Sequence, residues 1–205
     1  MTDPLPVVVP PALSAAEVEH RLTDRERPAA LPPVVRQDAA AIAPGARRSA
    51  VLVPVVLHDE PTVLLTLRTA TLSAHAGQVA FPGGRIEEGE TPEAAAIREA
   101  AEEVGLDPRL PRIAGRLPEI YTGTGFHVVP VIALLDPPLA LTPAPEEVAE
   151  VFEYPLARLL DPAAPRRESG VFGGRTREYW IWPHDRHRIW GATATMLRSL
   201  ALALR

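Results

Sequence analysis

The segment most informative about the fold reads Gly84-Arg-Ile-Glu-Glu-Gly-Glu90, then Thr91-Pro-Glu-Ala-Ala-Ala-Ile97, then Arg98-Glu-Ala-Ala-Glu-Glu-Val-Gly-Leu106. Thr91 is a good N-cap, Pro92 suits the first helical position, and Gly105 is typical of the residue that follows the last turn. The segment therefore predicts a helix from Pro92 to about Val104, preceded by a loop that contains glycine.

This helix carries three carboxylates: Glu99, Glu102 and Glu103. At about 100° per residue they fall within roughly a third of the helix circumference. The apolar residues Ile97, Ala101 and Val104 are expected on the opposite side, toward a core. Like charges three and four residues apart destabilise a helix by a few tenths of a kcal/mol per pair, so the cluster needs a counter-charge. Mg²⁺ supplies one, because it prefers carboxylate oxygens. A solvated acidic helix face is the alternative interpretation.

The loop before the helix favours the metal interpretation. Pro82-Gly-Gly84 is predicted as a turn in which Gly83 and Gly84 allow the backbone to approach a ligand closely. The carbonyl group of Gly83 is then available to the same cation. Glu90 and Arg98 are expected to pair and to hold this loop against the helix.

The rest of the chain mixes strands and helices without regular βαβ alternation. Strands are predicted at residues 50–57, 62–67, 78–81, 112–117, 127–135, 148–153 and 178–182. Helices are predicted at residues 156–160 and about 191–204, the latter with apolar residues spaced for burial on one side. This pattern favours an α+β fold, or a sheet between helices, over a doubly wound fold.

The chain is expected to divide into an arm and one domain. Residues 1–48 are interpreted as a proline-rich N-terminal arm, and residues 49–205 as the domain. Within the arm, Ser14-Ala-Ala-Glu17 is a capping box, which predicts a short helix toward Leu22.

The composition excludes several classes of function. With 46% hydrophobic and 23% charged residues, an ordinary soluble globular protein is expected. A net charge of −5 argues against a protein that binds nucleic acid across a broad basic face. The absence of cysteine excludes disulfides, zinc knuckles and thiol catalysis. We find no signal peptide and no apolar stretch long enough for a membrane span. A cytoplasmic protein is therefore expected, and a homodimer stays open.

The segment from Gly84 to Leu106 resembles the complete Nudix box. The matching positions are Gly84, Glu90, Arg98, Glu99, Glu102, Glu103, Gly105 and the aliphatic Leu106. The resemblance implies an α/β/α sandwich with a mixed sheet between helices. It also implies Mg²⁺- or Mn²⁺-dependent hydrolysis of a nucleoside diphosphate that is linked to another group.

The resemblance also assigns roles to residues by position. The implied metal ligands are Glu99, Glu102, Glu103 and the carbonyl group of Gly83. Glu90 and Arg98 take the structural pairing role. We predict that Glu102 accepts the proton of the attacking water, with Glu99 as the second catalytic carboxylate. Glu146, Glu147 and Glu150 are the alternative bases, and the number of metal ions stays open.

A second resemblance concerns the substrate. Leu64-Leu-Thr66, Arg68-Thr69, His75-Ala-Gly77-Gln78 and Phe81-Pro-Gly-Gly84 are similar to the signature of the coenzyme A pyrophosphatase branch of the family. Residues 125–130 and 189–193 are similar to that branch as well. The implied substrate-binding residues are Arg68, His75, Gln78 and Phe81, although Phe81 also suits a core position. One departure is that Ser73 stands where the branch has an arginine.

The predicted function is hydrolysis of the pyrophosphate bond of coenzyme A to 3′,5′-ADP and 4′-phosphopantetheine. Arg68 and His75 suit a phosphate, the arginine through a bidentate contact. Because Ser73 removes a cation that would hold the 3′-phosphate, a Nudix hydrolase of ADP-ribose or NADH is one alternative. A catalytically inactive Nudix binding module is the other, although such a module has no need of the intact carboxylate set.

Overall fold

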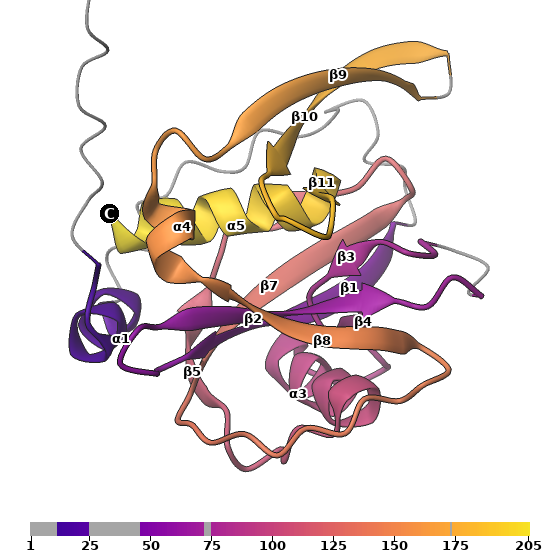
Figure 1. The fold of residues 1–205 in the computed structure, drawn as a ribbon. Coiled ribbons are helices and arrows are strands. Elements are labelled where there is room, and N and C mark those ends of the chain that lie inside the picture. The colour runs from indigo at the N-terminus through magenta and orange to yellow at the C-terminus, as the bar shows by residue number, and fades with distance from the viewer. Residues whose placement is uncertain (1–11, 25–45, 72–74, 173) are drawn as a thin grey trace, which may run out of the picture.

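The computed structural model describes residues 12–24, 46–71, 75–172 and 174–205 (Figure 1). The larger sheet contains β1 (Arg47–Val56), β2 (Thr62–Arg68), β3 (Val79–Ala80), β4 (Gly83–Arg85), β5 (Arg112–Arg116), β6 (Ile120–Tyr121), β7 (Phe126–Leu135) and β8 (Val148–Pro155). A smaller sheet contains β9 (Arg166–Phe172), β10 (Arg175–Trp182) and β11 (Ile189–Trp190). The helices are α1 (Ala15–Thr23), α3 (Pro92–Val104), α4 (Leu156–Leu160) and α5 (Gly191–Leu204).

The larger sheet is mixed and is organised around β1. This strand runs parallel to β7 over its whole length and pairs antiparallel with β2 and with β4. β8 pairs antiparallel with β2, and β5 with β7. The predicted turn at Pro82-Gly-Gly84 is wrong for its two glycines, because Gly83 and Gly84 belong to β4 and pair with Val51 and Ala50. This pairing brings the glycines under α3.

Two apolar clusters hold the helices on opposite sides of the larger sheet. One cluster joins α3 to β1 and β7, and the other joins α1, α4 and α5 to the other side (Figure 1). The expectation of an α+β fold with a mixed sheet between helices is confirmed. None of the helices among the described residues is long and apolar enough to cross a membrane.

The side of α3 that meets the sheet differs from the expected one. Its buried apolar residues are Ala95, Ala96, Ala100 and Val104, and Glu103 is buried beside them. Ile97 and Ala101, which were expected to face the core, are only partly buried. Alanines permit the helix to lie close to β1, and this close approach carries Glu103 into the protein.

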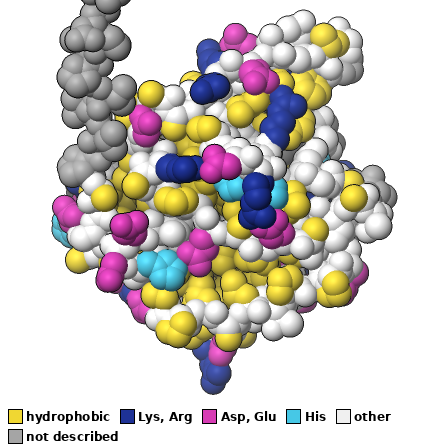
Figure 2. Space-filling model, in the orientation of Figure 1, with side chains coloured by type: hydrophobic (Ala, Val, Ile, Leu, Met, Phe, Trp, Pro, Cys, Tyr) yellow, Lys and Arg dark blue, Asp and Glu magenta, His cyan; other side chains and the backbone are white. Residues whose placement is uncertain are grey.

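The smaller sheet is only partly predicted by the sequence. The strand predicted at residues 178–182 is the second half of β10, whereas β9 and β11 were missed. Six of the seven residues of β9 are exposed, so its sequence lacks the apolar alternation that marks a half-buried strand. The β9–β10 hairpin lies over α5 in Figure 1, and Val171 and Phe172 near its end are exposed. Figure 2 shows hydrophobic side chains in the same region, above a surface of interspersed arginine and acidic side chains.

The N-terminal helix predicted from the capping box is present and belongs to the core. The side chain of Ser14 accepts from the backbone of Glu17, whose carboxylate accepts from the backbone of Ser14. Val18 and Leu22 are fully buried in the cluster that contains α5. Part of the predicted arm therefore contributes to the stability of the domain.

We expect Leu22→Ala to lower the free energy of unfolding by about 2–5 kcal/mol, because it removes a buried side chain and leaves a cavity. The measurement is urea denaturation followed by circular dichroism. Leu110→Ala is the matched control, since Leu110 is 43% exposed, and its effect should stay within about 0.5 kcal/mol. Equal effects of the two substitutions would show that α1 does not contribute to the core.

Candidate active site

The helix that carries the carboxylates is capped at both ends as the sequence predicts. The hydroxyl of Thr91 accepts from the backbone N–H of Ala94 at 3.2 Å. Gly105 ends the helix in the left-handed conformation with φ 67°. The three glutamates of the helix differ strongly in environment. The side chain of Glu102 is 61% exposed, whereas that of Glu103 is 4% exposed.

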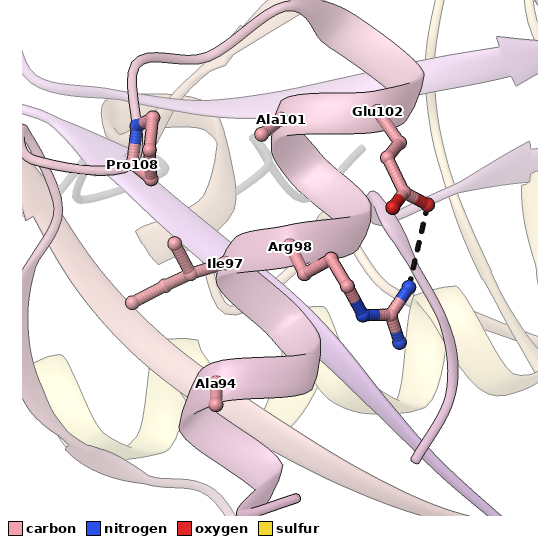
Figure 3. Close-up of a pocket in the computed structure, with 6 residues that line it drawn as sticks. All are labelled: Ala94, Ile97, Arg98, Ala101, Glu102 and Pro108. Carbon is pink, nitrogen blue, oxygen red and sulfur yellow. Dashed lines mark hydrogen bonds and ion pairs between the residues drawn. The ribbon is translucent and has the colours of Figure 1, made fainter. Parts of the chain in front are cut away.

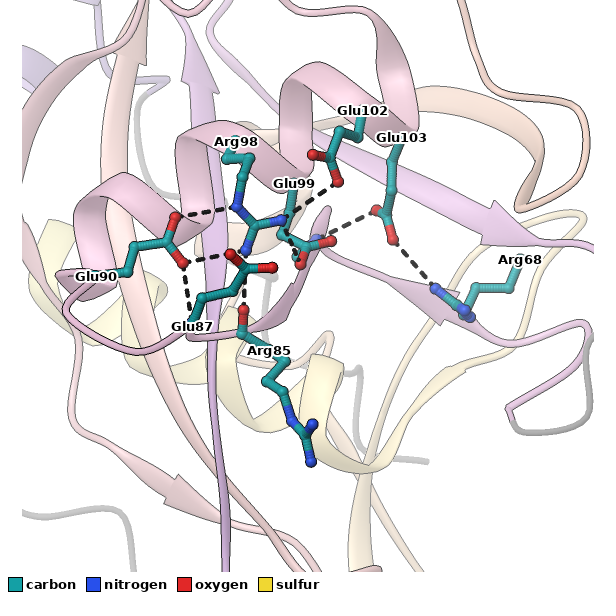
Figure 4. Close-up of polar contacts among 9 residues, drawn as sticks. Arg68, Arg85, Glu87, Glu90, Arg98, Glu99, Glu102 and Glu103 are labelled. Atoms are coloured by element: carbon teal, nitrogen blue, oxygen red, sulfur yellow. Dashed lines mark hydrogen bonds and ion pairs between the residues drawn. The ribbon is translucent and has the colours of Figure 1, made fainter.

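Arg98 lies at the centre of the acidic cluster (Figure 4). Its guanidinium donates to Glu90 at 3.0 and 3.1 Å, to Glu99 at 3.0 Å and to Glu102 at 3.3 Å. It also donates to the carbonyl group of Arg85 at 3.0 Å. These contacts confirm the predicted pairing of Glu90 with Arg98 and show how the loop before α3 is held against the helix.

Glu103 is the most deeply buried carboxylate of the helix. One of its oxygens accepts from the N–H of Gly83 at 3.2 Å, and the other accepts from Arg68 at 3.3 Å. Burial raises the pKa of Glu103 to about 7, and the charges of Glu147 and Glu99 act in the same direction. The guanidinium of Arg68 and the N–H of Gly83 oppose this shift. A carboxylate that is this costly to ionise favours a nearby cation.

Glu99 lies directly against Gly84 of β4. A Cβ atom at Gly84 would overlap the carboxylate of Glu99, so only glycine leaves room for that group. Burial raises the pKa of Glu99, and its hydrogen bond to Arg98 opposes the shift. The glycine that the sequence analysis assigned to a close backbone approach therefore makes room for a side chain of the site.

The segment between β7 and β8 is fastened to the end of α3. Thr142 donates from its N–H to the carbonyl of Val104 at 2.8 Å, and Ala144 donates to the carbonyl of Glu103 at 2.9 Å. The other end of the segment is held by Thr69, whose N–H donates to the carbonyl of Glu147 at 3.0 Å. The bonds from Thr142 and Ala144 satisfy carbonyl groups that the last turn of a helix leaves unpaired.

The same segment brings one of the three alternative bases to the site. Glu147 lies 3.9 Å from Arg68, and its charge raises the pKa of both Glu99 and Glu103. Glu150, in contrast, is held by Arg186 at 2.5 Å on the next strand, β8. Neither the Arg68–Glu103 contact nor the attachment of this segment was predicted, because both join residues that are far apart in the sequence.

The other predicted substrate-binding residues differ in their surroundings. The imidazole Nδ1 of His75 lies 3.0 Å from the side-chain oxygen of Gln78, and both residues precede β3. Phe81 is 3% exposed and belongs to the core cluster, so its assignment as a substrate contact is wrong. Ser73 lies outside the described residues.

The outer face of α3 carries an open groove of about 570 Å³ (Figure 3). Its lining residues are Ala94, Ile97, Arg98, Ala101, Glu102 and Pro108. The groove accounts for the partial exposure of Ile97 and Ala101. Figure 3 shows both side chains on the side of the helix away from Glu102.

The donor groups of the site fit a hard divalent cation in their chemistry. Three carboxylates and a glycine backbone offer oxygen ligands only, which is the set that Mg²⁺ and Mn²⁺ prefer. Within the described ranges, however, no three acidic or histidine side chains are gathered closely enough to hold an ion. Arg98 lies between Glu99 and Glu102, and Arg68 lies against Glu103.

The chain matches one family model and several known proteins. The family model described as NUDIX domain matches residues 46–171. A protein of Cronobacter sakazakii described as the uncharacterized Nudix hydrolase NudL is 43% identical over 159 residues, which cover 77% of this chain and 83% of the relative. The protein of the same name from Salmonella newport is 40% identical over the same shares of the two chains.

The fold is shared with a solved structure. A Deinococcus radiodurans protein has a TM-score of 0.50 at 18% identity and covers 76% of this chain and 86% of its own. The Nudix hydrolase RenU of M. smegmatis has a TM-score of 0.46 at 30% identity and covers 54% of this chain and 71% of its own.

Fold and carboxylate helix together define the class of protein as a Nudix hydrolase. The chain belongs to the Nudix family, on the match of more than half its length and on relatives that are at least 40% identical. Nudix hydrolases act on small nucleotide substrates and generally use divalent metal ions.

We expect Gly84→Ala to reduce hydrolytic turnover about 10- to 100-fold. The added methyl group displaces the Glu99 carboxylate, and a misplacement of about 1 Å can cost about 10²-fold in rate. The measurement is kcat at saturating Mn²⁺, with circular dichroism to verify the fold. Arg85→Ala is the control, since the side chain of the next residue in β4 is exposed. Wild-type turnover in Gly84→Ala would show that the position of Glu99 has no role in the reaction.

Proposed function

We propose that this Nudix hydrolase cleaves the pyrophosphate bond of coenzyme A or its derivatives, giving 3′,5′-ADP and 4′-phosphopantetheine. The observation that carries the proposal is the sequence of residues 64–84, which is similar to the coenzyme A pyrophosphatase signature. The geometry supports it in one respect. Arg68 from this stretch extends to the carboxylates of α3, so the segment that suggests the substrate borders the segment that determines the reaction.

Glu99, Glu102, Glu103 and the carbonyl group of Gly83 are proposed to hold the cation. When bound, the cation neutralises the phosphate oxygens and stabilises the leaving phosphate. The chain itself has three tasks. Arg98 keeps Glu99 and Glu102 in place, Gly84 leaves room for Glu99, and the N–H of Gly83 fixes the orientation of Glu103.

Glu102 is proposed as the general base. The oxygen of a water forms a bond to one phosphorus, the bridging oxygen leaves with the other phosphate, and one proton of the water passes to Glu102. Among Glu99, Glu102 and Glu103, Glu102 is the most exposed, and within the described residues its carboxylate is held by one contact of 3.3 Å. Glu99 and Glu103 are more tightly enclosed, Glu99 against Gly84 and Glu103 between Gly83 and Arg68, and they are assigned to the cation.

A second candidate substrate follows from Ser73. Coenzyme A carries a 3′-phosphate that ADP-ribose and NADH lack, and the arginine that the branch has at this position is absent here. Hydrolysis of ADP-ribose or NADH is therefore the alternative. One assay distinguishes coenzyme A from ADP-ribose and NADH, because only coenzyme A carries the additional phosphate.

We expect coenzyme A to be hydrolysed faster than dephospho-coenzyme A, ADP-ribose and NADH in the presence of Mg²⁺ or Mn²⁺. A charge-assisted contact to the 3′-phosphate corresponds to roughly 10- to 150-fold in kcat/KM. The measurement is a mass-spectrometric assay of products from the four compounds at equal concentration. Hydrolysis of ADP-ribose as fast as coenzyme A would rule out the proposed substrate and leave the hydrolase class intact.

The choice of base is tested by Glu102→Gln and Glu147→Gln, with Glu146→Gln as the control from the same segment. At saturating Mn²⁺ we expect Glu102→Gln to lower kcat by about 10²- to 10⁴-fold with little change in KM. Glu147→Gln should retain most of its kcat. If Glu102→Gln instead keeps most of its kcat at saturating Mn²⁺ while Glu147→Gln is inactive, the base is Glu147, which lies 3.9 Å from Arg68.

A further inference from the structure

Two arginines neutralise the carboxylates of the site, and they are held in different ways. The guanidinium of Arg98 is saturated by three carboxylates and a carbonyl group at 3.0–3.3 Å. Within the described part of the chain, Arg68 has only two such contacts, 3.3 Å to Glu103 and 3.9 Å to Glu147. Arg98 therefore has a structural role, whereas Arg68 can exchange its carboxylate partners for other ligands.

The backbone of Arg68 is fixed although its side chain is loosely held. Arg68 is the last residue of β2, where the register shifts, and its N–H donates to the carbonyl of Gln78 at 3.0 Å. The N–H of Gly77 donates to the carbonyl of Arg68 at 3.2 Å. A long side chain on a fixed backbone can turn away from Glu103 without disturbing the strand.

The position of Arg68 conflicts with a cation at Glu103. Its guanidinium lies against a carboxylate that is 4% exposed, where water screens charge poorly. A divalent cation on the same carboxylate would repel the guanidinium at this separation. The same guanidinium lies 3.9 Å from Glu147, so Arg68 bridges the two carboxylates.

We propose that Arg68 is an internal counter-ion that holds Glu103 and Glu147 until a divalent cation displaces it. The inference rests on the proposed assignment of the cation to the α3 carboxylates. After displacement, the guanidinium of Arg68 has lost its buried partner and stands at the border of the site. It then suits an anionic phosphate oxygen. The cation and the anionic ligand consequently bind with positive coupling that passes through Arg68.

This exchange makes two opposite predictions for one substitution. Removing Arg68 removes a competitor, so the cation alone should bind more tightly. Removing Arg68 also removes the link between the two ligands, so the cation should strengthen the binding of the anion less than it does in the wild type. Coupling is reciprocal, so either ligand can be titrated.

The experiment uses the full chain, Mn²⁺ as the cation and α,β-methylene-ADP as an anion that resists hydrolysis. Free Mn²⁺ is measured by electron paramagnetic resonance in titrations with and without the analogue. The variants are Arg68→Ala and Arg68→Gln, so that a folding defect in one leaves the other. Arg68→Lys keeps a positive charge, and Arg85→Ala removes an arginine whose side chain is exposed.

We expect Arg68→Ala and Arg68→Gln to bind Mn²⁺ about fivefold or more tightly than the wild type and to show coupling that is weaker by a similar factor. Arg68→Lys and Arg85→Ala should stay within about twofold of the wild type, below the range of ordinary coupling between sites. Unchanged or weaker Mn²⁺ binding in both neutral variants would overturn the inference alone. Failure of the wild type to bind Mn²⁺ would overturn both the inference and the proposed metal site.

Discussion

Negative charge concentrated on one helix is the constraint on which the rest of the structure depends. Glu99, Glu102 and Glu103 project from α3, and Glu103 does so from a buried position. A buried charge is tolerated only when it is paired and hydrogen-bonded. The partners come from α3 itself, from the end of β2 and from the backbone of β4. Neutralising the helix therefore also fixes these elements relative to one another.

The features that were predicted from the sequence are those that depend on neighbouring residues. Thr91, Pro92 and Gly105 determine the ends of α3 by local chemistry, and the structure has the helix at these bounds. The pairing of Glu90 with Arg98 was also predictable, because only Thr91 and the first turns of α3 separate them. The side of α3 that faces the sheet was harder to predict. Angular spacing placed Ile97 and Ala101 on the core side, yet small alanines determine which side approaches the sheet closely.

The features that were missed depend on contacts between distant segments. Arg68 suits a phosphate when the sequence is considered alone, and only the fold shows that it lies against Glu103. The segment that ends at Glu147 carries no local signal that it bonds to the carbonyl groups of α3. The smaller sheet was incomplete for another reason. β9 buries little, so the alternation by which strands are recognised is absent.

The difference between local features and contacts of distant segments also explains why the sequence predicts the class of reaction better than the substrate. The groups proposed to act on the phosphoanhydride come from one continuous segment, residues 83–103, whose members hold one another in place. The groups proposed to border the substrate come from the end of β2, from the residues before β3 and from the segment before β8. Because the two sets of groups come from separate segments, related chains can share the reaction while their substrates differ. Arg68 is the exception, since it touches both sets, and a change there alters the helix charge and the substrate border together.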